Sequence, residues 1–84
     1  MKHLPEWWEW ELEITPHALK RMDDREFTEL ELRAMLEHAL RLRRGETEGR
    51  WIIETRHRRH LWEVVVEPDM DARLLVVVTA YPVW

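Results

Sequence analysis

The sequence predicts a single α+β domain in which a four-stranded antiparallel sheet is covered on one face by two helices. Three observations carry this prediction: a length of only 84 residues, two well-marked helix starts in the first half, and three strand-like segments in the second half. At roughly 100 to 200 residues per domain, the length gives one domain, residues 1–84, and leaves no room for a second lobe. The order strand, helix, helix, strand, strand, strand is typical of α+β proteins.

The first strand is expected over Trp7–Ile14, where large apolar side chains alternate with glutamates. This alternation is the two-residue period of a strand that buries one face. The buried face would hold Trp8, Trp10, Leu12 and Ile14, and the acidic face Glu9, Glu11 and Glu13. The pattern assigns no environment to Trp7 or Trp84.

The first helix is expected to begin after Thr15, because threonine caps helix N-termini and Pro16 suits the first helical position. It should run to about Asp24. Its buried side chains would be Ala18, Leu19 and Met22.

The second helix should begin at Thr28, which forms a capping box with Glu31. Apolar residues then recur at helical spacing as far as Ala39. We expect three arginines in its last turn, where they would meet the negative end of the helix dipole, and a stop at Gly45. These arginines are Arg41, Arg43 and Arg44.

The remaining strands are expected over Arg50–His57, Leu61–Glu67 and Leu74–Tyr81, with a turn at residues 68–71 between the last two. If Arg58 and Arg59 form the tip of the first hairpin, the apolar residues of both strands fall on one face. That register places Glu54 directly opposite Glu63 on the other face.

Two directly opposed carboxylates repel one another unless an arginine or a proton relieves them. On the last strand, Thr79 and Tyr81 interrupt an apolar run and are expected on the same face as Leu75 and Val77.

Charge and composition exclude several functional classes. The chain holds 13 Lys and Arg against 17 Asp and Glu, a net charge of −4, so uniform attachment to nucleic acid or anionic lipid is not expected. Because there is no cysteine, thiolate metal sites and thiol nucleophiles are excluded. No apolar run is long enough to span a bilayer and no signal peptide is recognisable, so we expect a cytoplasmic protein without membrane contact.

A polar stripe of His17, Arg21 and Arg25 lies along the first helix at intervals of four residues. A neutral imidazole beside guanidiniums suits removal of a proton from a hydroxyl next to a phosphate. The alternative is a solvated helix face whose arginines pair with Asp24 or nearby acids.

A second basic run, residues 56–60, could grip a phosphate backbone or an acidic partner, or could be a solvated turn. His57 and His60 have no third ligand in view, so no metal is expected.

Three stretches, ITPHALKRMDDREFTELELRAMLEHA, GRWIIETRHRRHLWEVVVEPD and LLVVVTAYPV, resemble a bacterial family known as domain of unknown function 4258. The likeness covers about residues 12–83, with an HxxxR opening at His17 and Arg21 and a closing T-A-Y-P. The family's usual glycine after the Arg25 position is Glu26 here. The family resembles the barnase, EndoU, colicin and RelE-like group. This resemblance implies a RelE-like fold and a metal-independent RNase, with the toxin of a toxin-antitoxin pair as a candidate role.

The resemblance implies cleavage of RNA by its own 2′-hydroxyl and without a cofactor. His17 or Glu54 would be the base, Arg21 and Arg56 would stabilise the phosphorane, and Tyr81 would be the acid. RNA-binding positions would be Arg25, Arg58, Arg59 and Thr79. The expected partners are RNA and an antitoxin protein, and the oligomeric state, a homodimer included, stays open. The rival interpretation is a non-catalytic protein-interaction module that uses the arginine stripe, the acidic first strand, or an exposed Trp7 or Trp84.

Overall fold

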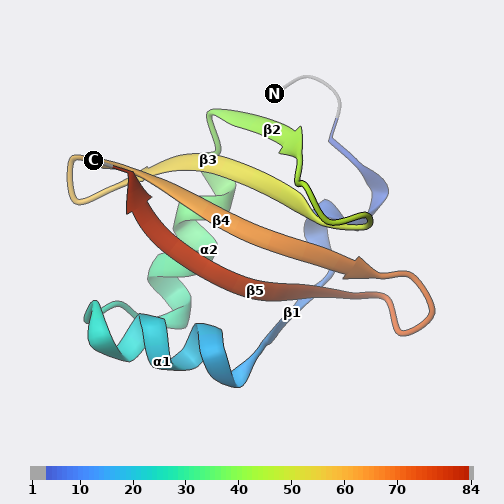
Figure 1. Ribbon diagram of the computed structural model, residues 1–84, viewed down its shortest axis with the longest axis horizontal. Helices are drawn as coiled ribbons and strands as arrows, with labels where there is room; N and C mark the ends of the chain where they lie inside the picture. Colours follow the sequence, from blue (N-terminus) through green and yellow to red (C-terminus); the bar gives the residue numbers. More distant parts are fainter. Residues whose placement is uncertain (1–3, 84) are drawn as a thin grey trace.

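The computed structural model describes residues 4–83 and contains two α-helices and five strands (Figure 1). The elements follow one another as a 3₁₀ helix η1 (Glu6–Glu9), β1 (Glu11–Ile14), α1 (Pro16–Asp24), α2 (Glu29–Glu37), β2 (Arg41–Arg44), β3 (Trp51–His57), β4 (His60–Asp69) and β5 (Leu74–Val83). The predicted α+β class and the order strand, helix, helix, strands are confirmed. Trp84 lies outside the described residues.

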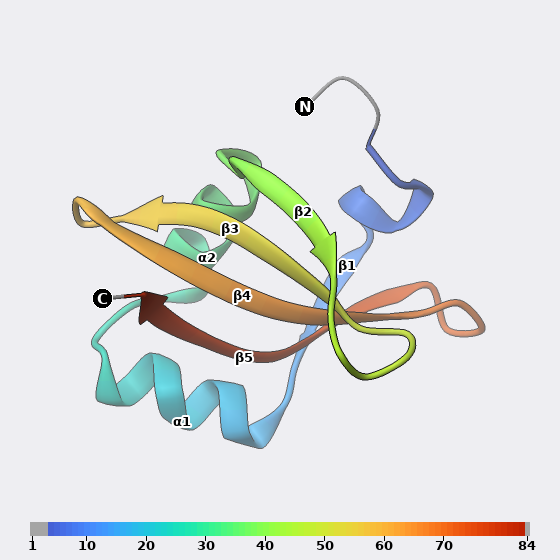
Figure 2. The ribbon, with the colours of Figure 1, turned by 45° about the horizontal axis from the view of Figure 1, so that its top comes forward.

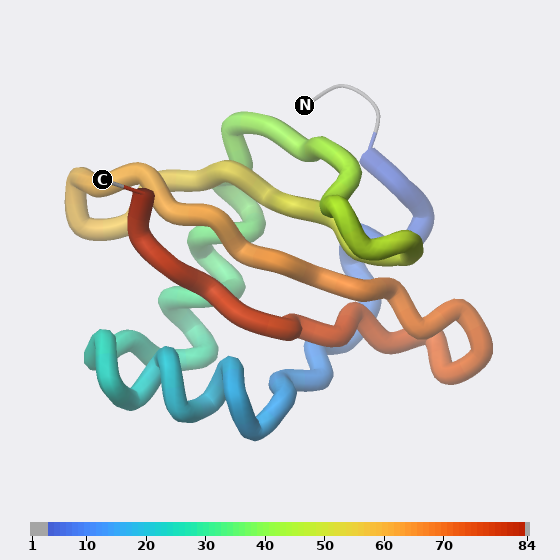
Figure 3. Tube along the Cα trace, viewed as in Figure 1, coloured from blue at the N-terminus to red at the C-terminus, as the bar shows by residue number. Residues whose placement is uncertain are grey.

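The strands form one sheet in the order β1-β5-β4-β3-β2 (Figure 2). β1 runs parallel to β5, and the other neighbours are antiparallel, so the predicted fully antiparallel, four-stranded sheet is corrected on both counts. α1 packs against β5 and α2 against β3, with both helices on one side of the sheet (Figures 1 and 3). The core lies between this helix layer and the sheet, and the opposite face of the sheet stays open.

The additional strand, β2, occupies residues that the sequence assigned to the end of the second helix. α2 ends at Glu37, and Arg41–Arg44 pairs antiparallel with β3. Only Leu42 of its four side chains is turned partly inward. Charged side chains are common on edge strands because they discourage pairing with other chains. The arginines of this short edge strand therefore could not be distinguished, from the sequence, from arginines at the C-terminal end of a helix.

The N-terminal segment departs from the predicted strand because residues 6–9 form a turn of 3₁₀ helix. This turn rotates Trp7 into the core, where it is 5% exposed and its ring lies 5.9 Å from that of Trp51. Trp8 and Trp10 only pack against the edge of the core. The expected two-residue alternation begins at β1, where Leu12 and Ile14 are the inward side chains.

Both helix starts are confirmed. The Thr15 hydroxyl accepts the Ala18 N–H at 3.1 Å, and Thr28 and Glu31 form the complete capping box. Ala18 and Met22 are buried as predicted. The assignment of Leu19 to the core was wrong, since it is 53% exposed. A nine-residue helix lying on a sheet buries a narrow stripe, and Leu19 falls outside it.

The predicted hairpin register is confirmed: Glu54 pairs with Glu63, Thr55 with Trp62 and Ile53 with Val64. The tip is the two-residue turn Arg58-Arg59, with φ of 50° and 69°. Positive φ at both positions is the requirement of the type I′ turn that matches strand twist.

A β-bulge in β5 changes the faces of its second half. Val65 pairs with Thr79 and Val66 with Val77, so Val78 has no partner on β4. Its carbonyl instead accepts the Thr15 hydroxyl at 3.1 Å. Beyond the extra residue, side chains change face. Ala80 and Pro82 are therefore buried, whereas Thr79 and Tyr81 occupy the open face, and the expectation that they share a face with Leu75 and Val77 was wrong.

The turn after α1 places Glu26 in the left-handed conformation, with φ of 57°. The Phe27 N–H donates to the Met22 carbonyl and the Glu26 N–H to the Asp23 carbonyl. These two bonds make a Schellman motif, in which glycine is the usual residue at the left-handed position. Glu26 therefore adopts the left-handed conformation in which the resembled family has glycine. A residue with a Cβ atom adopts this conformation at a higher free-energy cost than glycine.

Replacing Glu26 by glycine should stabilise the protein by about 0.5 to 1 kcal/mol, because the relief of the left-handed conformation exceeds the added chain entropy. Urea unfolding followed by circular dichroism measures the change. Glu26→Gln, which removes the charge but keeps the Cβ atom, is the matched control and should gain nothing. Equal gains in both variants would attribute the effect to charge and contradict the conformational explanation.

Candidate functional site

The open face of the sheet carries a row of polar side chains across three adjacent strands. Glu54 on β3 lies opposite Glu63 on β4, and Glu63 lies opposite Tyr81 on β5. Arg43 of β2 reaches over this row. We call Arg43, Glu54, Glu63 and Tyr81 the open-face cluster.

Short hydrogen bonds join the open-face cluster into a chain. The Tyr81 hydroxyl donates to Glu63 Oε1 at 2.6 Å, and Arg43 Nη2 donates to Glu63 Oε2 at 2.7 Å. Arg43 Nε also donates to Glu54 Oε2 at 3.2 Å. Arg41 approaches the same carboxylate at 3.8 Å. The repulsion expected between Glu54 and Glu63 is thus relieved by an arginine, Arg43. An arginine was one of the two possibilities named for this pair, the other being a proton.

Exposure and electrostatics differ along this chain. The Glu63 side chain is 16% exposed and that of Glu54 is 28% exposed. The hydrogen bond to Glu63, with smaller contributions from burial and the Glu63 charge, raises the pKa of Tyr81 to about 12. The phenol therefore keeps its proton throughout the neutral range.

A cavity of about 490 Å³ opens above one end of the cluster. Arg43, Glu63 and Tyr81 line it together with the loop that joins β2 to β3. Among residues 4–83, Arg43 Nη1 donates to no acceptor and Glu54 Oε1 accepts from no donor. The cluster thus retains a donor nitrogen and an acceptor oxygen for a ligand.

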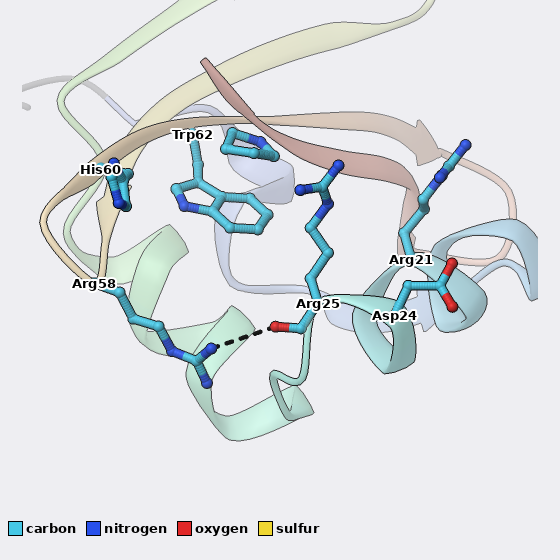
Figure 4. Close-up of a pocket in the computed structure, with 7 residues that line it drawn as sticks. Arg21, Asp24, Arg25, Arg58, His60 and Trp62 are labelled. Atoms are coloured by element: carbon cyan, nitrogen blue, oxygen red, sulfur yellow. Dashed lines mark hydrogen bonds between the residues drawn. The ribbon is translucent and has the colours of Figure 1, made fainter. Parts of the chain in front are cut away.

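A second group of sequence-predicted residues lies on the other side of the sheet. Arg21, Arg25 and Arg58 line a pocket of about 440 Å³ between α1 and the β3–β4 hairpin (Figure 4). The other lining residues are Asp24, His60, Trp62 and Pro82. We call this the helix–hairpin pocket.

Arg58 connects the two sides of this pocket through hydrogen bonds. Its guanidinium donates to the backbone carbonyls of Arg25 and Glu26 at 3.3 and 2.5 Å, and to Glu31 at 3.5 Å. In Figure 4 it points toward the turn that follows α1. Arg58 therefore ties the hairpin tip to the helix layer.

The structure does not bring the predicted catalytic set into one place. Glu54 and Tyr81 meet through the open-face cluster, while Arg21 belongs to the helix–hairpin pocket. His17 is exposed in the first turn of α1, eight residues before Arg25 and thus about 12 Å away along the axis. Arg56 lies two residues after Glu54, beside a smaller pocket at the end of α2.

The remaining predicted RNA-binding positions lie apart from both groups. Arg59 is exposed at the hairpin tip, and Thr79 is on the open face opposite Val65.

Sequence reasoning missed Arg43 as a site residue because it was assigned to a helix end. The alternation of Arg41, Leu42 and Arg43 was the available signal for a strand. His60 and Trp62 were assigned to a turn and to the core, and no sequence signal places them beside Arg25.

Within the described range, no three His, Asp or Glu side chains gather at a spacing that would hold a metal ion. Neither helix in residues 4–83 has the length and apolar character needed to cross a bilayer.

Comparison with known proteins gives one match. The family model for the domain of unknown function DUF4258 matches residues 14–82. The chain belongs to this family. No curated protein and no solved structure matches it significantly. The family description assigns this DUF4258 domain no activity, so any function must be argued from the open-face cluster and the helix–hairpin pocket.

The chemistry of Tyr81 can be followed directly, because it is the one tyrosine in this DUF4258 domain. Absorbance at 295 nm against pH should give an ionisation midpoint near 12, above the ordinary value of 10. Glu63→Gln should lower the midpoint toward 10, because the charged acceptor is lost. Since the folded pKa lies above the unfolded one, the stabilisation that the Tyr81 bond contributes is complete below pH 10 and disappears between pH 10 and 12.

Glu11→Gln, on the exposed side of β1, is the control and should leave the midpoint unchanged. A wild-type midpoint at 10, or equal midpoints in the wild type and Glu63→Gln, would contradict the bond between Tyr81 and Glu63.

Proposed function

We propose that this DUF4258 domain is a metal-independent endoribonuclease that cleaves RNA on the open face of its sheet. The observation that carries the proposal is the hydrogen-bonded chain of carboxylate, guanidinium, carboxylate and phenol in the open-face cluster. It combines a base, a cation and an acid, which are the groups that transfer of a phosphoryl group to a neighbouring hydroxyl requires. The same chemistry is what the RNase interpretation of the sequence expects.

Glu54 is the proposed base. Its Oε2 is held by Arg43, which fixes the carboxylate, while Oε1 is free of the bonds described above. Glu54 takes the proton of the RNA 2′-hydroxyl, and the resulting oxyanion attacks the adjacent phosphorus. Its position beside Arg43 and on the face of Tyr81 favours Glu54 over His17, which lies in the helix layer.

Arg43 is the proposed electrostatic stabiliser. Two of its nitrogens are used by the glutamates, and Nη1 can donate to a non-bridging phosphate oxygen. Because its orientation is fixed before substrate binds, little reorganisation is needed as charge develops on the phosphorane. In this proposal Arg43 takes the role that the resemblance gave to Arg21 and Arg56.

Tyr81 is the proposed acid. Its raised pKa keeps the phenol protonated, and its hydroxyl proton passes to the departing 5′-oxygen as the phosphorus–oxygen bond breaks. In the free protein that proton is donated to Glu63 at 2.6 Å, so the hydroxyl turns from Glu63 to the 5′-oxygen once substrate is bound. The products are a 2′,3′-cyclic phosphate and a 5′-hydroxyl. Glu54 releases the 2′-hydroxyl proton to solvent, and solvent returns the phenol proton. DNA is not a substrate because it lacks the 2′-hydroxyl.

The purified domain should cleave single-stranded RNA in the presence of EDTA and leave DNA of the same sequence intact. Glu54→Gln should lower the cleavage rate at least about 100-fold, the usual contribution of a general base. The rate is measured on an end-labelled oligonucleotide, and circular dichroism checks that the variant is folded.

Glu11→Gln provides the matched control, with the same change on an exposed strand far from the cluster, and should keep full activity. His17→Ala should also remain active, which separates this mechanism from one with a histidine base. If folded Glu54→Gln cleaves as fast as the wild type, the open-face mechanism fails.

A role as the toxin of a toxin-antitoxin pair follows from the same proposal. Induced expression should then arrest bacterial growth, and Glu54→Gln should relieve the arrest. An antitoxin encoded by a neighbouring gene would be recovered bound to the domain.

The alternative function is a non-catalytic protein-interaction module. It is favoured by the acidic strand β1, which forms an edge of the sheet with Glu11 and Glu13 exposed. Trp7 no longer supports it, because this side chain is buried. Absence of cleavage for every RNA tested, together with recovery of one stoichiometric protein partner whose binding survives Glu54→Gln, would favour this alternative.

A further inference from the structure

We propose that the helix–hairpin pocket is a phosphate-binding site, separate from the open-face cluster and independent of whether that cluster cleaves RNA. The ligand class is a phosphate monoester or diester. The proposal comes from two guanidiniums without an ion-pair partner among residues 4–83, an aromatic wall beside them, and a positive charge balance in the pocket.

Arg21 and Arg25 stand one helical turn apart on α1, so their Cα atoms are separated by about 6 Å along the axis. Figure 4 shows both side chains extending from the helix toward the sheet, on the same side. Two guanidinium forks at this spacing can donate to different oxygens of one tetrahedral anion.

Neither guanidinium is neutralised. Within residues 4–83, no carboxylate forms an ion pair with Arg21 or Arg25. Asp24, the acidic residue of the pocket, pairs instead with Lys20 at 4.0 Å. Pairing of these arginines with Asp24, one part of the alternative raised by the sequence, is therefore absent among these residues, whereas both arginines are exposed, as a solvated helix face requires. By contrast, Arg43 and Arg50 each have a glutamate partner at 3.2 Å or less.

The opposite wall is apolar and buried. Trp62 is 6% exposed, and the Arg25 guanidinium carbon lies 6.0 Å from its ring centre. Pro82 extends this wall, and His60 stands at the hairpin side of the pocket (Figure 4). A low-dielectric wall strengthens the interaction of a guanidinium with an anion, because less water screens it.

The two walls of the pocket are linked by Arg58. Its guanidinium donates to backbone carbonyls of the turn after α1, which leaves the guanidiniums of Arg21 and Arg25 out of this link. The lining carries three guanidiniums and one carboxylate, a formal balance of +2 in a chain of net charge −4. This local excess attracts anions that the rest of the surface repels.

The chemistry favours phosphate over a carboxylate. A carboxylate presents two oxygens in one plane and is satisfied by a single fork. A phosphate group presents oxygens in three dimensions and can accept from Arg21 and Arg25 together. The volume of about 440 Å³ leaves room for the rest of a nucleotide beside that group.

Titration of the ¹⁵N-labelled full chain with inorganic phosphate, followed by two-dimensional NMR, tests the proposal directly. Shifts should concentrate on the backbone of residues 21–25, on His60 and on the Trp62 indole N–H. Adenosine 5′-monophosphate and a DNA oligonucleotide, which lacks the 2′-hydroxyl needed for cleavage, form the other two arms. Tighter binding of the oligonucleotide identifies a polynucleotide backbone as the ligand, and equal binding of the monophosphate identifies a free nucleotide.

Arg21→Ala and Arg25→Ala should each weaken binding of the tightest probe about tenfold, the usual effect of losing one charge-assisted contact. Arg73→Gly is the matched control, because it removes one arginine from the turn between β4 and β5, outside the pocket lining, and glycine accepts the φ of 56° found there. Affinity should be unchanged in this control.

Three results would overturn the proposal: no saturable shift with any probe, shifts spread over all arginines, or equal losses of affinity in Arg21→Ala and Arg73→Gly. Glu54→Gln separates this site from the proposed RNase activity, since it should abolish cleavage and leave phosphate binding intact.

Discussion

The bulge at Val78 decides what each face of this molecule presents. Without the extra residue, Tyr81 would point into the core and Pro82 into solvent, because a shift of one residue reverses every side chain of a strand. The bulge is stabilised from outside the sheet: the Thr15 hydroxyl donates to the Val78 carbonyl and accepts the Ala18 N–H. One threonine thus satisfies the irregular strand and caps the helix. Both candidate sites depend on this arrangement.

Because of the bulge, consecutive residues of β5 serve the two sites. Tyr81 bonds to Glu63 on the open face, and Pro82 lines the helix–hairpin pocket on the other. β1 pairs with residues 74–77 of β5, so among residues 4–83 the second half of β5 has no strand beside it on that side. The two candidate sites therefore lie on opposite faces of the same strand.

The sequence was most informative about strand register, which is fixed by the apolar side chains that must lie inward, and about helix starts. The pairing of Glu54 with Glu63 follows from Ile53 and Val64 lying inward, and the helix starts follow from local capping chemistry. It was least informative where tertiary contacts decide. The bulge depends on Thr15, which is 63 residues from Val78, and no property of valine marks it. β2 is a strand only because β3 lies beside it.

The arginines of the two candidate sites differ in whether a carboxylate pairs with them, and this difference suits one site to catalysis and the other to binding. Arg43 is held between two glutamates, so its charge is largely balanced and it would add little to the affinity for an anion, whereas its geometry is fixed. Among residues 4–83, Arg21 and Arg25 have no carboxylate ion-pair partner, and they belong to a pocket separate from the open-face cluster. An acidic protein that acts on a polyanion must find its affinity in a local excess of positive charge. The helix side supplies that excess, and the open face supplies the groups that can move a proton.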